Sequence, residues 1–229
     1  MQIQLIINKC FKMMISSIFG EKGVVSKKYI SKFLKEDPII VEAGAHIGVD
    51  TCEMAKLWPK AKIFAFEPIP EIFEQLKNNT SSYPNVQCFQ MALGDKTGEC
   101  TINQSSGESN GSSSLLEPKE HLVFHPSVFF EKKIEVKVTT LKDWMKTNKI
   151  EKVDFLWLDL QGFELNVLKE SVEIISKTST IYTEVSIIEN YSNSALYPQL
   201  KDFLENAGFK AKKEKIAWSD GGNVLFIRK

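Results

Sequence analysis

Four acidic residues each follow an apolar stretch of the sequence, and their positions point to a shared site. Glu42 follows residues 39–41, Glu67 follows a second apolar run, and Asp159 and Glu184 come at the ends of two more. Parallel strands of an α/β sheet bring their carboxyl ends to one edge, where ligands bind. Carboxylates at that edge can accept hydrogen bonds from hydroxyl groups, attract an ammonium group or take up a proton. We therefore expect a binding and catalytic site there.

A glycine turn follows the first of these acids and precedes a segment with helical spacing, residues 49–57. The turn contains Gly44, Ala45, His46 and Gly48. Glycine at its two ends would allow the backbone to approach a ligand closely. The spacing is not the G-x-G-x-x-G of dinucleotide-binding folds, and Glu42 would repel a phosphate while attracting an ammonium or a ribose hydroxyl. The pattern disfavours an NAD-linked dehydrogenase, and a purely structural turn is the alternative.

The second acid lies where nucleotide-binding α/β units carry a ribose ligand. Glu67 ends the strand predicted over residues 61–67 and precedes Pro68, roughly 20 residues beyond the glycine turn. A carboxylate at this place accepts hydrogen bonds from the ribose hydroxyls. A solvated strand end is the alternative, but the preceding glycine turn favours the ribose role.

Five segments, taken together, resemble the FkbM-type methyltransferases. They are VEAGAHIG (41–48), FEPIP (66–70), MALGD (91–95), VTTLKDW (138–144) and VDFLWLDLQGFE (153–164), in the family's order. The resemblance implies the Rossmann-like, doubly wound seven-stranded sheet of class I methyltransferases and S-adenosylmethionine as cofactor. Because the family mostly methylates hydroxyl groups of sugars and natural products, it also implies an O-methyltransferase that acts on a sugar or glycan acceptor or on a related hydroxylated metabolite. The family's acceptors vary widely, so the motifs do not identify the acceptor.

The resemblance also assigns cofactor-binding positions. They are Glu42, Gly44, Ala45, His46, Gly48, Glu67, Pro68, Ala92 and Leu93. Two of these depart from the family, which usually has Asp in place of Glu42 and commonly Asn in place of His46. Neither replacement removes a hydrogen-bond acceptor. The alternative is a non-catalytic, cofactor-binding relative that acts as a partner or scaffold, but the intact set of acids favours the enzyme.

Asp159 and Glu184 are the predicted catalytic residues. Asp159 follows apolar residues of a strand, 153–160, that is expected to be central and buried on both faces. Beside a methyl donor, it could bind the acceptor hydroxyl, take up its proton or hold Mg²⁺ or Mn²⁺, with Glu184 as a second oxygen ligand. The alternatives are that Asp159 caps the next helix and that Glu184 is a bystander. Glu164 suits either a substrate contact or the dipole of that helix.

A polar insertion, residues 104–133, precedes the catalytic strand and contains His121 and His125. Long loops inside compact domains are usually functional, so we expect this one to form a lid or wall of the acceptor site. Its hydrogen-bonding candidates are Ser112, Ser113 and Ser114, and its sugar-stacking candidates are Phe124, Phe129 and Phe130. These aromatic residues could instead anchor the loop. His125 is a rival proton acceptor because its free pKa lies near neutrality.

Apolar periodicity predicts a helical extension over residues 1–37 and one α/β domain over residues 38–229. Predicted strands are 39–41, 61–67, 86–92, 153–160, 180–186, 209–216 and 223–228, with 100–103 pairing antiparallel to 134–140; predicted helices are 24–34, 49–57, 71–79, 141–148, 162–171 and 196–207. These elements should deliver the acids to one edge of a sheet.

The composition fits a cytoplasmic protein with one core. The 29 basic and 29 acidic residues cancel, which argues against a nucleic-acid partner. Cys10, Cys52, Cys88 and Cys100 show no CxxC spacing. They therefore indicate reduced, largely buried thiols and no zinc site.

The first 19 residues are strongly apolar but are interrupted by Lys9 and Lys12. That interruption comes too soon for a spanning helix of about 20 apolar residues, and no cleavage site of a secretory signal follows. Three alternatives remain open for residues 1–34: packing on the core or on a second copy as a homodimer, peripheral contact with a membrane, or a relic of a longer protein.

Overall fold

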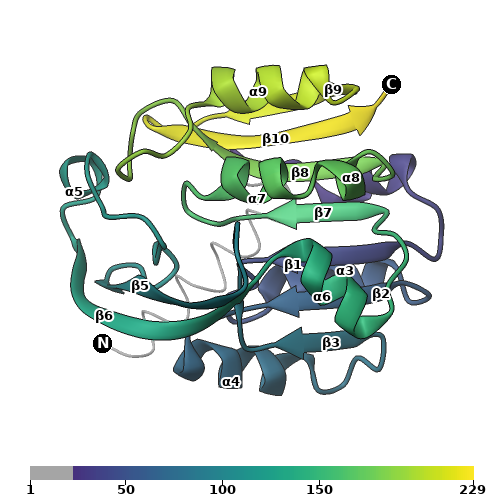
Figure 1. Ribbon diagram of the computed structural model, residues 1–229, viewed down its shortest axis with the longest axis horizontal. Helices are drawn as coiled ribbons and strands as arrows, with labels where there is room; N and C mark the ends of the chain where they lie inside the picture. Colours follow the sequence, from purple (N-terminus) through teal and green to yellow (C-terminus); the bar gives the residue numbers. More distant parts are fainter. Residues whose placement is uncertain (1–22) are drawn as a thin grey trace, which may run out of the picture.

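The computed structural model describes residues 23–229 and contains a seven-stranded sheet in the order β3-β2-β1-β7-β8-β10-β9 (Figure 1). The strands are β1 (Ile39–Ala43), β2 (Lys62–Phe66), β3 (Val86–Phe89), β7 (Phe155–Leu158), β8 (Thr180–Ser186), β9 (Phe209–Ile216) and β10 (Gly221–Arg228). The first five strands in spatial order run parallel, and β10 is antiparallel to both neighbours. The predicted doubly wound α/β sheet is confirmed.

Side chains of the central strands alternate between two core clusters, as strand geometry requires. Val41 and Leu156 face a cluster with α6 (Leu141–Asn148), α7 (Glu164–Glu170), α8 (Val172–Ile175) and α9 (Tyr197–Asn206). Ile40 and Phe155 face the opposite cluster, built with α2 (Lys27–Ile30) and α3 (Val49–Leu57). The apolar runs are continuous because both faces of these strands are covered.

A second, three-stranded sheet has the order β4-β6-β5. Its strands are β4 (Ala92–Leu93), β5 (Gly98–Gly107) and β6 (Val128–Thr139), and β5 and β6 form the predicted antiparallel pair. This β5–β6 ribbon lies beyond the carboxyl ends of the parallel strands, together with α5 (His121–Phe124), at the left of Figure 1. The ribbon brings the inserted residues to the edge at which the site was expected.

The structure corrects one predicted strand and one predicted loop. The strand predicted over residues 86–92 divides, because β3 pairs with β2 whereas β4 pairs with β6. The insertion 104–133 is not a continuous loop, since both of its ends extend the ribbon and only residues 108–127 lie between β5 and β6. The sequence did not predict that β5 and β6 continue to pair over this stretch, because its residues are mostly polar and lack the alternation typical of a strand.

The helix predicted over residues 24–34 is also shorter in the structure. The side chain of Ser26 accepts a hydrogen bond from the backbone of Tyr29, so α2 begins at Lys27. A 3₁₀ turn, η1 (Ser31–Phe33), follows α2. The helix predicted over residues 71–79 is confirmed as α4 (Pro70–Thr80).

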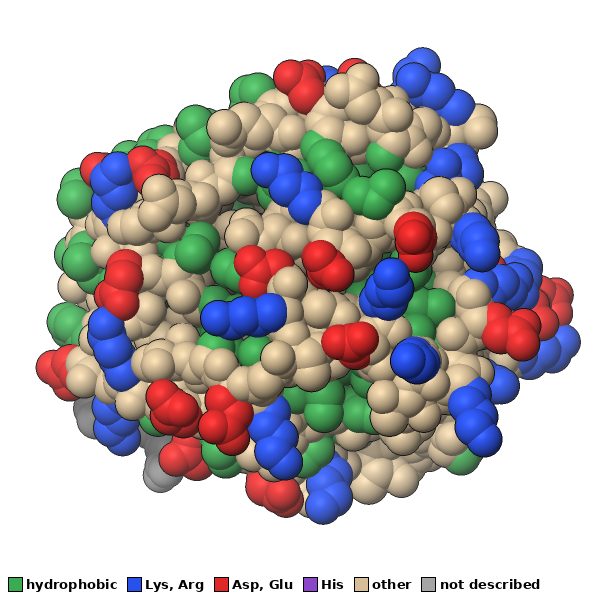
Figure 2. Space-filling model, viewed as in Figure 1, with side chains coloured by type: hydrophobic (Ala, Val, Ile, Leu, Met, Phe, Trp, Pro, Cys, Tyr) green, Lys and Arg blue, Asp and Glu red, His purple; other side chains and the backbone are tan. Residues whose placement is uncertain are grey.

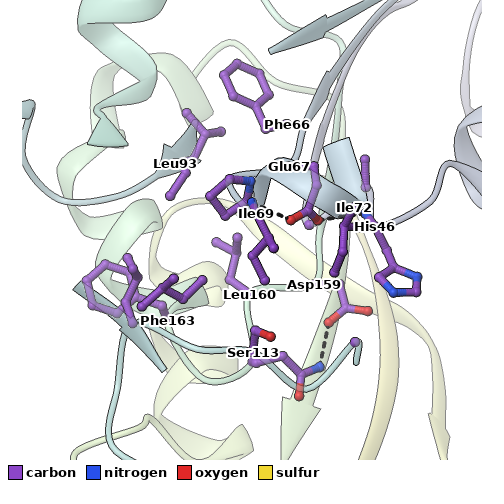
Figure 3. Close-up of a pocket in the computed structure, with 18 of the residues that line it drawn as sticks. His46, Phe66, Glu67, Ile69, Ile72, Leu93, Ser113, Asp159, Leu160 and Phe163 are labelled. Atoms are coloured by element: carbon purple, nitrogen blue, oxygen red, sulfur yellow. Dashed lines mark hydrogen bonds between the residues drawn. The ribbon is translucent and has the colours of Figure 1, made fainter. Parts of the chain in front are cut away.

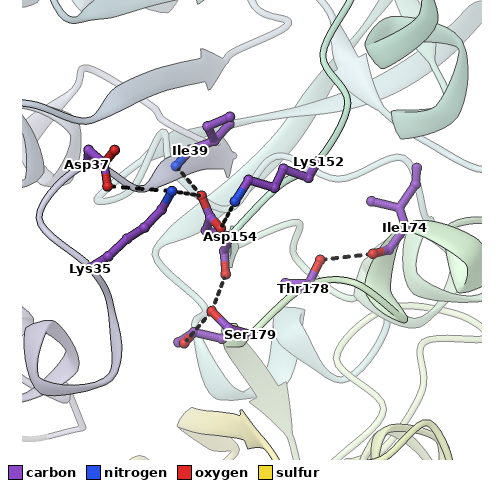
Figure 4. A network of polar contacts seen from close by, with 9 residues as sticks. Lys35, Asp37, Ile39, Lys152, Asp154, Ile174, Thr178 and Ser179 are labelled. Carbon is purple, nitrogen blue, oxygen red and sulfur yellow. Dashed lines mark hydrogen bonds and ion pairs between the residues drawn. The ribbon is translucent and has the colours of Figure 1, made fainter.

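Asp154 ties together the starts of β1 and β7 (Figure 4). Its Oδ2 accepts a hydrogen bond from the backbone N of Ile39 at 2.8 Å, and its Oδ1 accepts one from Lys152 at 3.1 Å. The Lys35 Nζ lies 3.6 Å from Oδ2. Burial opposes ionisation, but these partners outweigh it and hold the pKa of Asp154 below its ordinary value. The network secures the end of the sheet opposite the expected site.

The segment that begins at Gly23 is part of the fold. The backbone N of Val25 donates a hydrogen bond to Tyr182 Oη at 3.2 Å, and Asn223 Nδ2 donates one to the Gly23 carbonyl at 3.0 Å. Lys27 forms ion pairs with two acidic residues of α3. Residues 1–22, which contain the predicted apolar helix, lie outside the described part of the chain.

In residues 23–229, no helix combines the length and the apolar character that crossing a membrane requires.

Three cysteines of this part, Cys52, Cys88 and Cys100, are free and half-buried, whereas the sequence predicted largely buried thiols. Lys, Arg, Asp and Glu side chains are interspersed across the face shown in Figure 2.

Candidate active site

A cavity with about 980 Å³ of empty space, part of it open to solvent, lies at the carboxyl ends of β1, β2 and β7 (Figure 3). Its walls are Gly44, Ala45, His46, Val49 and Asp50 after β1; Phe66, Glu67, Pro68, Ile69 and Ile72 at the end of β2 and beyond; Ala92 and Leu93 of β4; Ile102 of β5; Asn110, Gly111, Ser113 and Leu115 of the loop between β5 and β6; and Asp159, Leu160, Gln161 and Phe163 after β7. The structure therefore brings together seven of the nine predicted cofactor residues and Asp159.

The glycine turn needs glycine for a reason other than the one expected. Gly44 has a φ of +85°, and a Cβ there would stand 1.8 Å from the carbonyl oxygen of Asp159. Gly48 also has a φ of +85°, and a Cβ there would stand 2.7 Å from Leu76 Cδ1. The close approach is thus between parts of the protein itself. His46, at a φ of +50°, adopts the left-handed conformation that Asn and His tolerate better than most residues.

Glu67 is nearly buried, at 5% exposure, and holds the glycine turn against the end of β2. Its Oε2 accepts a hydrogen bond from the backbone N of His46 at 3.1 Å, and its Oε1 accepts one from Ile69 at 2.9 Å. Burial raises the pKa of Glu67 to about 7, although these hydrogen bonds favour the charged form. Each carboxylate oxygen can accept a further hydrogen bond, so Glu67 can still bind hydroxyl groups in the cavity.

The structure does not place Glu42 or Gly48 on the cavity wall. Glu42 lies beneath the turn at 1% exposure, and Thr51 Oγ1 donates a hydrogen bond to its Oε2 at 2.5 Å. Burial, with the nearby charge of Asp50, raises the pKa of Glu42 to about 8. The carboxylate that lines the cavity on this side is instead Asp50, in the first turn of α3.

Asp159 and Glu184 lie at neighbouring strand ends and share one partner. Asp159 is exposed to the cavity, whereas Glu184 is half-buried behind the wall. Gln161 Nε2 donates hydrogen bonds to Asp159 Oδ1 at 2.8 Å and to Glu184 Oε2 at 2.7 Å. The surrounding protein raises the pKa of Asp159 even though its carboxylate faces the cavity, and burial together with the charge of Asp159 raises that of Glu184. The pair can therefore hold and exchange a proton.

Glu164 has a structural role. It is 5% exposed, and its Oε1 accepts hydrogen bonds from the backbone N of Leu160 at 2.8 Å and of Gly162 at 3.3 Å. Burial raises its pKa to about 7. This carboxylate, rather than Asp159, closes the turn before α7, which is why α7 begins at Glu164 and not at Gly162. The alternative that Asp159 caps this helix is wrong.

The donor set does not fit the divalent metal considered from the sequence. No group of three or more His, Cys, Asp or Glu side chains in residues 23–229 is placed to hold an ion. The amide N–H groups of Gln161 point at both Asp159 and Glu184, and hydrogen-bond donors cannot ligate a cation.

The inserted residues divide between the cavity and the surface. Ser113 lines the cavity, whereas Ser114 Oγ donates a hydrogen bond to the carbonyl of Gln161 at 2.7 Å. Phe124 and Phe129 are 39% and 48% exposed and lie outside the cavity wall. Phe130 packs edge-on against His121, with ring centroids 5.3 Å apart. Anchoring, and not cavity stacking, is therefore what the structure shows for Phe130.

His125 and Trp218 also lie away from the cavity wall. His125 Nε2 lies 2.8 Å from Asp220 Oδ2, in a contact that holds α5 against the β9–β10 turn. The ring of Trp218 covers Gly23, where an added Cβ would come within 2.9 Å of it. His125 is therefore not placed as a proton acceptor for a ligand in the cavity.

Sequence reasoning missed four residues at or beside the cavity. They are Asp50, Asn110, Gln161 and Tyr191. Asn110 Oδ1 lies 2.9 Å from His46 Nε2, so the ribbon loop contacts the glycine turn. Gln161 is a polar residue between the two acids of the DLQGFE segment, and this position in the sequence could have indicated a role in the site. Nothing local marks Asn110 or Tyr191, because their partners are 64 and 30 residues away in the chain.

Comparison with known proteins agrees with this geometry. The family model described as the methyltransferase FkbM domain matches residues 42–211. The 2-O-methyltransferase NoeI of Sinorhizobium fredii is 31% identical over 185 residues, which cover 79% of this chain and 76% of that protein. The hexuronic acid methyltransferase AglP of Haloferax volcanii is 23% identical, over 75% of this chain and 64% of that protein.

A solved structure shares the fold. The crystal structure of a methyltransferase FkbM from Methylobacillus flagellatus superimposes with a TM-score of 0.53 at 14% identity. The match covers 86% of this chain but only 45% of that one. Sheet order, site position and the family match over most of the chain lead to one conclusion: the protein belongs to the FkbM family of S-adenosylmethionine-dependent methyltransferases.

Proposed function

We propose that the protein methylates a hydroxyl group of a sugar or glycan. The observation that carries this proposal is the Asp159 carboxylate, which faces the cavity and adjoins the glycine turn. An alcohol is a weak nucleophile that must lose its proton as it reacts, and a carboxylate within hydrogen-bond reach can accept that proton. The relatives named for 2-O-methylation and for hexuronic acid support a sugar as the acceptor.

The residues around the cavity fit the cofactor. We assign the ribose hydroxyls to Glu67, whose carboxylate keeps free acceptor positions, and the adenine to the apolar walls formed by Ile69, Leu93 and Phe163. The amino-acid end then lies at the glycine turn, where Asp50 can pair with the ammonium group. When bound, S-adenosylmethionine supplies a methyl group on a positively charged sulfur, which the acceptor oxygen takes as the carbon–sulfur bond breaks.

Asp159 performs the protein's chemical step. It holds the acceptor hydroxyl in line with the methyl carbon and takes its proton as the new carbon–oxygen bond forms. Ser113 and Asn110, in the loop between β5 and β6, offer hydrogen-bonding groups to other hydroxyls of the acceptor. Ile102 and Leu115 provide apolar surface on the same wall. Such a mixed wall suits a pyranose ring, which has polar edges and apolar faces.

Replacing Glu67 by Ala should weaken binding of S-adenosylhomocysteine, the demethylated product, by roughly 1.5–3 kcal/mol, the usual cost of lost hydrogen bonds to a charged group. This corresponds to roughly a 10- to 150-fold rise in Kd by isothermal titration calorimetry. Glu71→Ala, an exposed acid in the first turn of α4, is the matched control and should bind normally. Equal affinity in both variants would remove Glu67 from the ribose site.

The acceptor is tested with methyl-labelled S-adenosylmethionine and a panel of neutral pyranosides, uronic acids and oligosaccharides, alongside amine, thiol and phenol acceptors. We expect label in a sugar, and NMR should show it as an O-methyl group at one ring position. Transfer to an amine or thiol in preference to every sugar would overturn the proposal. Because a family member can be active on one glycan alone, the panel should include extracts of complex glycans.

A further inference from the structure

We propose that Gln161 is a positioning residue, which keeps Asp159 ionised beside Glu184 and is itself oriented by Tyr191. This inference rests on the proposed role of Asp159 as proton acceptor. It adds a hydrogen bond that favours the charged form of Asp159 although a second carboxyl group lies beside it. Such a bond is needed because two close carboxylates cannot readily both ionise.

The side-chain amide of Gln161 makes contacts with three residues. Its Nε2 lies 2.8 Å from Asp159 Oδ1 and 2.7 Å from Glu184 Oε2, so one NH₂ group supplies a proton to each carboxylate. Its Oε1 accepts a hydrogen bond from Tyr191 Oη at 2.9 Å. Both hydrogen atoms and one oxygen of the amide are therefore engaged, and the side chain has little freedom to turn.

Tyr191 determines which way the amide faces. Its side chain is 2% exposed, and burial with the nearby carboxylates holds the pKa far above its ordinary value, so the hydroxyl stays a donor. A flipped amide would place its NH₂ group against that hydroxyl and its oxygen against two carboxylates. The single proton of this hydroxyl is shared between Gln161 Oε1 and the carbonyl oxygen of Ser112, which lies 2.7 Å away and connects this arrangement to the loop between β5 and β6.

The backbone of Gln161 is held in an unfavourable conformation. Its φ is +51°, a left-handed value that a non-glycine residue adopts at a cost. Ser114 Oγ holds its carbonyl through a 2.7 Å hydrogen bond. Strained residues of this kind persist where the surrounding structure compensates for them, often at functional sites. Glycine would relieve the strain, so a glutamine here points to a use for its side chain.

The charges around Asp159 are mostly of its own sign. Five acidic residues are close enough to act on its charge: Glu42 in β1, Asp50 in α3, Glu67 just after β2, Glu164 in α7 and Glu184 in β8. A sixth acid, Asp220, lies near Glu184. The basic groups are His46, which acts on Asp159 directly, and Lys27, which acts on Glu42. These acids favour protonation of Asp159. Among residues 23–229, Gln161 provides the side-chain N–H group that donates a hydrogen bond to Asp159, and this bond favours the charged form of Asp159 against the effect of the acids.

The direct test is the titration of Asp159 in the cofactor-free protein, followed by NMR of ¹³C-labelled aspartate carboxyl groups and assigned with Asp159→Asn. Gln161→Gly keeps the left-handed backbone and removes the amide. A lost hydrogen bond to the charged form raises a carboxyl pKa, so we expect the Asp159 midpoint to move up by about one pH unit. Tyr191→Phe should move it in the same direction by less.

Lys149→Gly is the matched control. Lys149 also has a positive φ, +55°, but it ends α6, away from the cavity. This variant should leave the Asp159 titration unchanged. In the active enzyme, Gln161→Gly should shift the acid limb of the kcat/KM profile to higher pH by about one unit, because Asp159 must be ionised to accept a proton.

An unchanged Asp159 midpoint in Gln161→Gly would overturn the inference, as would a loss of activity that is equal at every pH. The NMR result does not depend on the acceptor, so failure of the sugar assignment cannot be mistaken for failure of this inference. Conversely, if Asp159→Asn keeps full turnover, the proposed function loses its base while the titration still decides the role of Gln161.

Discussion

Replacing Asp159 by Asn should lower turnover by about 100-fold or more, while the affinity for S-adenosylhomocysteine stays close to that of the wild type. An amide of the same shape can still accept the hydrogen bond from Gln161, but it cannot take up a proton. Because Asp159 lies on the cavity wall and makes no helix cap, the fold should survive. Initial rates with labelled cofactor and calorimetric binding of the product measure the two effects separately.

Asp154→Asn provides the control on the same strand. Asp154 binds Ile39 and Lys152 (Figure 4) and precedes β7, at the opposite end of the strand from Asp159 and the cavity. This variant should lower the melting temperature and leave the turnover of the folded enzyme unchanged. Wild-type turnover in Asp159→Asn would show that the reaction proceeds without this carboxylate.

Gly44→Ala should cost about 3 kcal/mol or more of unfolding free energy, because two penalties combine. The residue must keep its φ of +85°, which costs an alanine roughly 1–2 kcal/mol. Its Cβ would also stand 1.8 Å from the backbone oxygen of Asp159, which cannot move without separating the ends of β1 and β7. Urea denaturation measures the loss, and product binding should fall with it because the turn lines the cavity.

Gly98→Ala separates the two penalties. Gly98 has a φ of +147°, and a Cβ there would have no atom within 4 Å. This variant therefore carries the conformational cost alone, about 1–2 kcal/mol. If Gly44→Ala is no more destabilised than Gly98→Ala, the contact between the glycine turn and Asp159 is not tight in solution.

Much of the architecture could be predicted from the sequence because its causes are local. Continuous apolar runs at residues 39–41 and 155–158 predict strands covered on both faces, and the helices over 49–57 and 141–148 match α3 and α6 at both ends. An acid at the end of each such strand places Glu67 and Asp159 at one edge, since parallel strands share their direction. The methyltransferase family was evident from the same motifs.

Contacts between distant parts of the chain were decided only by the tertiary structure. The same strand-end pattern precedes Glu42 and Glu67, yet Glu42 is sealed beneath the turn by Thr51 whereas Glu67 lines the cavity. Position 44 must be glycine because the backbone oxygen of Asp159, 115 residues later in the chain, leaves no room for a Cβ. A ligand is not the reason. A sequence pattern records the type and period of side chains, but burial and hydrogen bonding depend on which segments meet. The side-chain amide of Gln161 bonds both Glu184 and Tyr191 because three separate segments of the chain pack together there. No local sequence pattern encodes that packing.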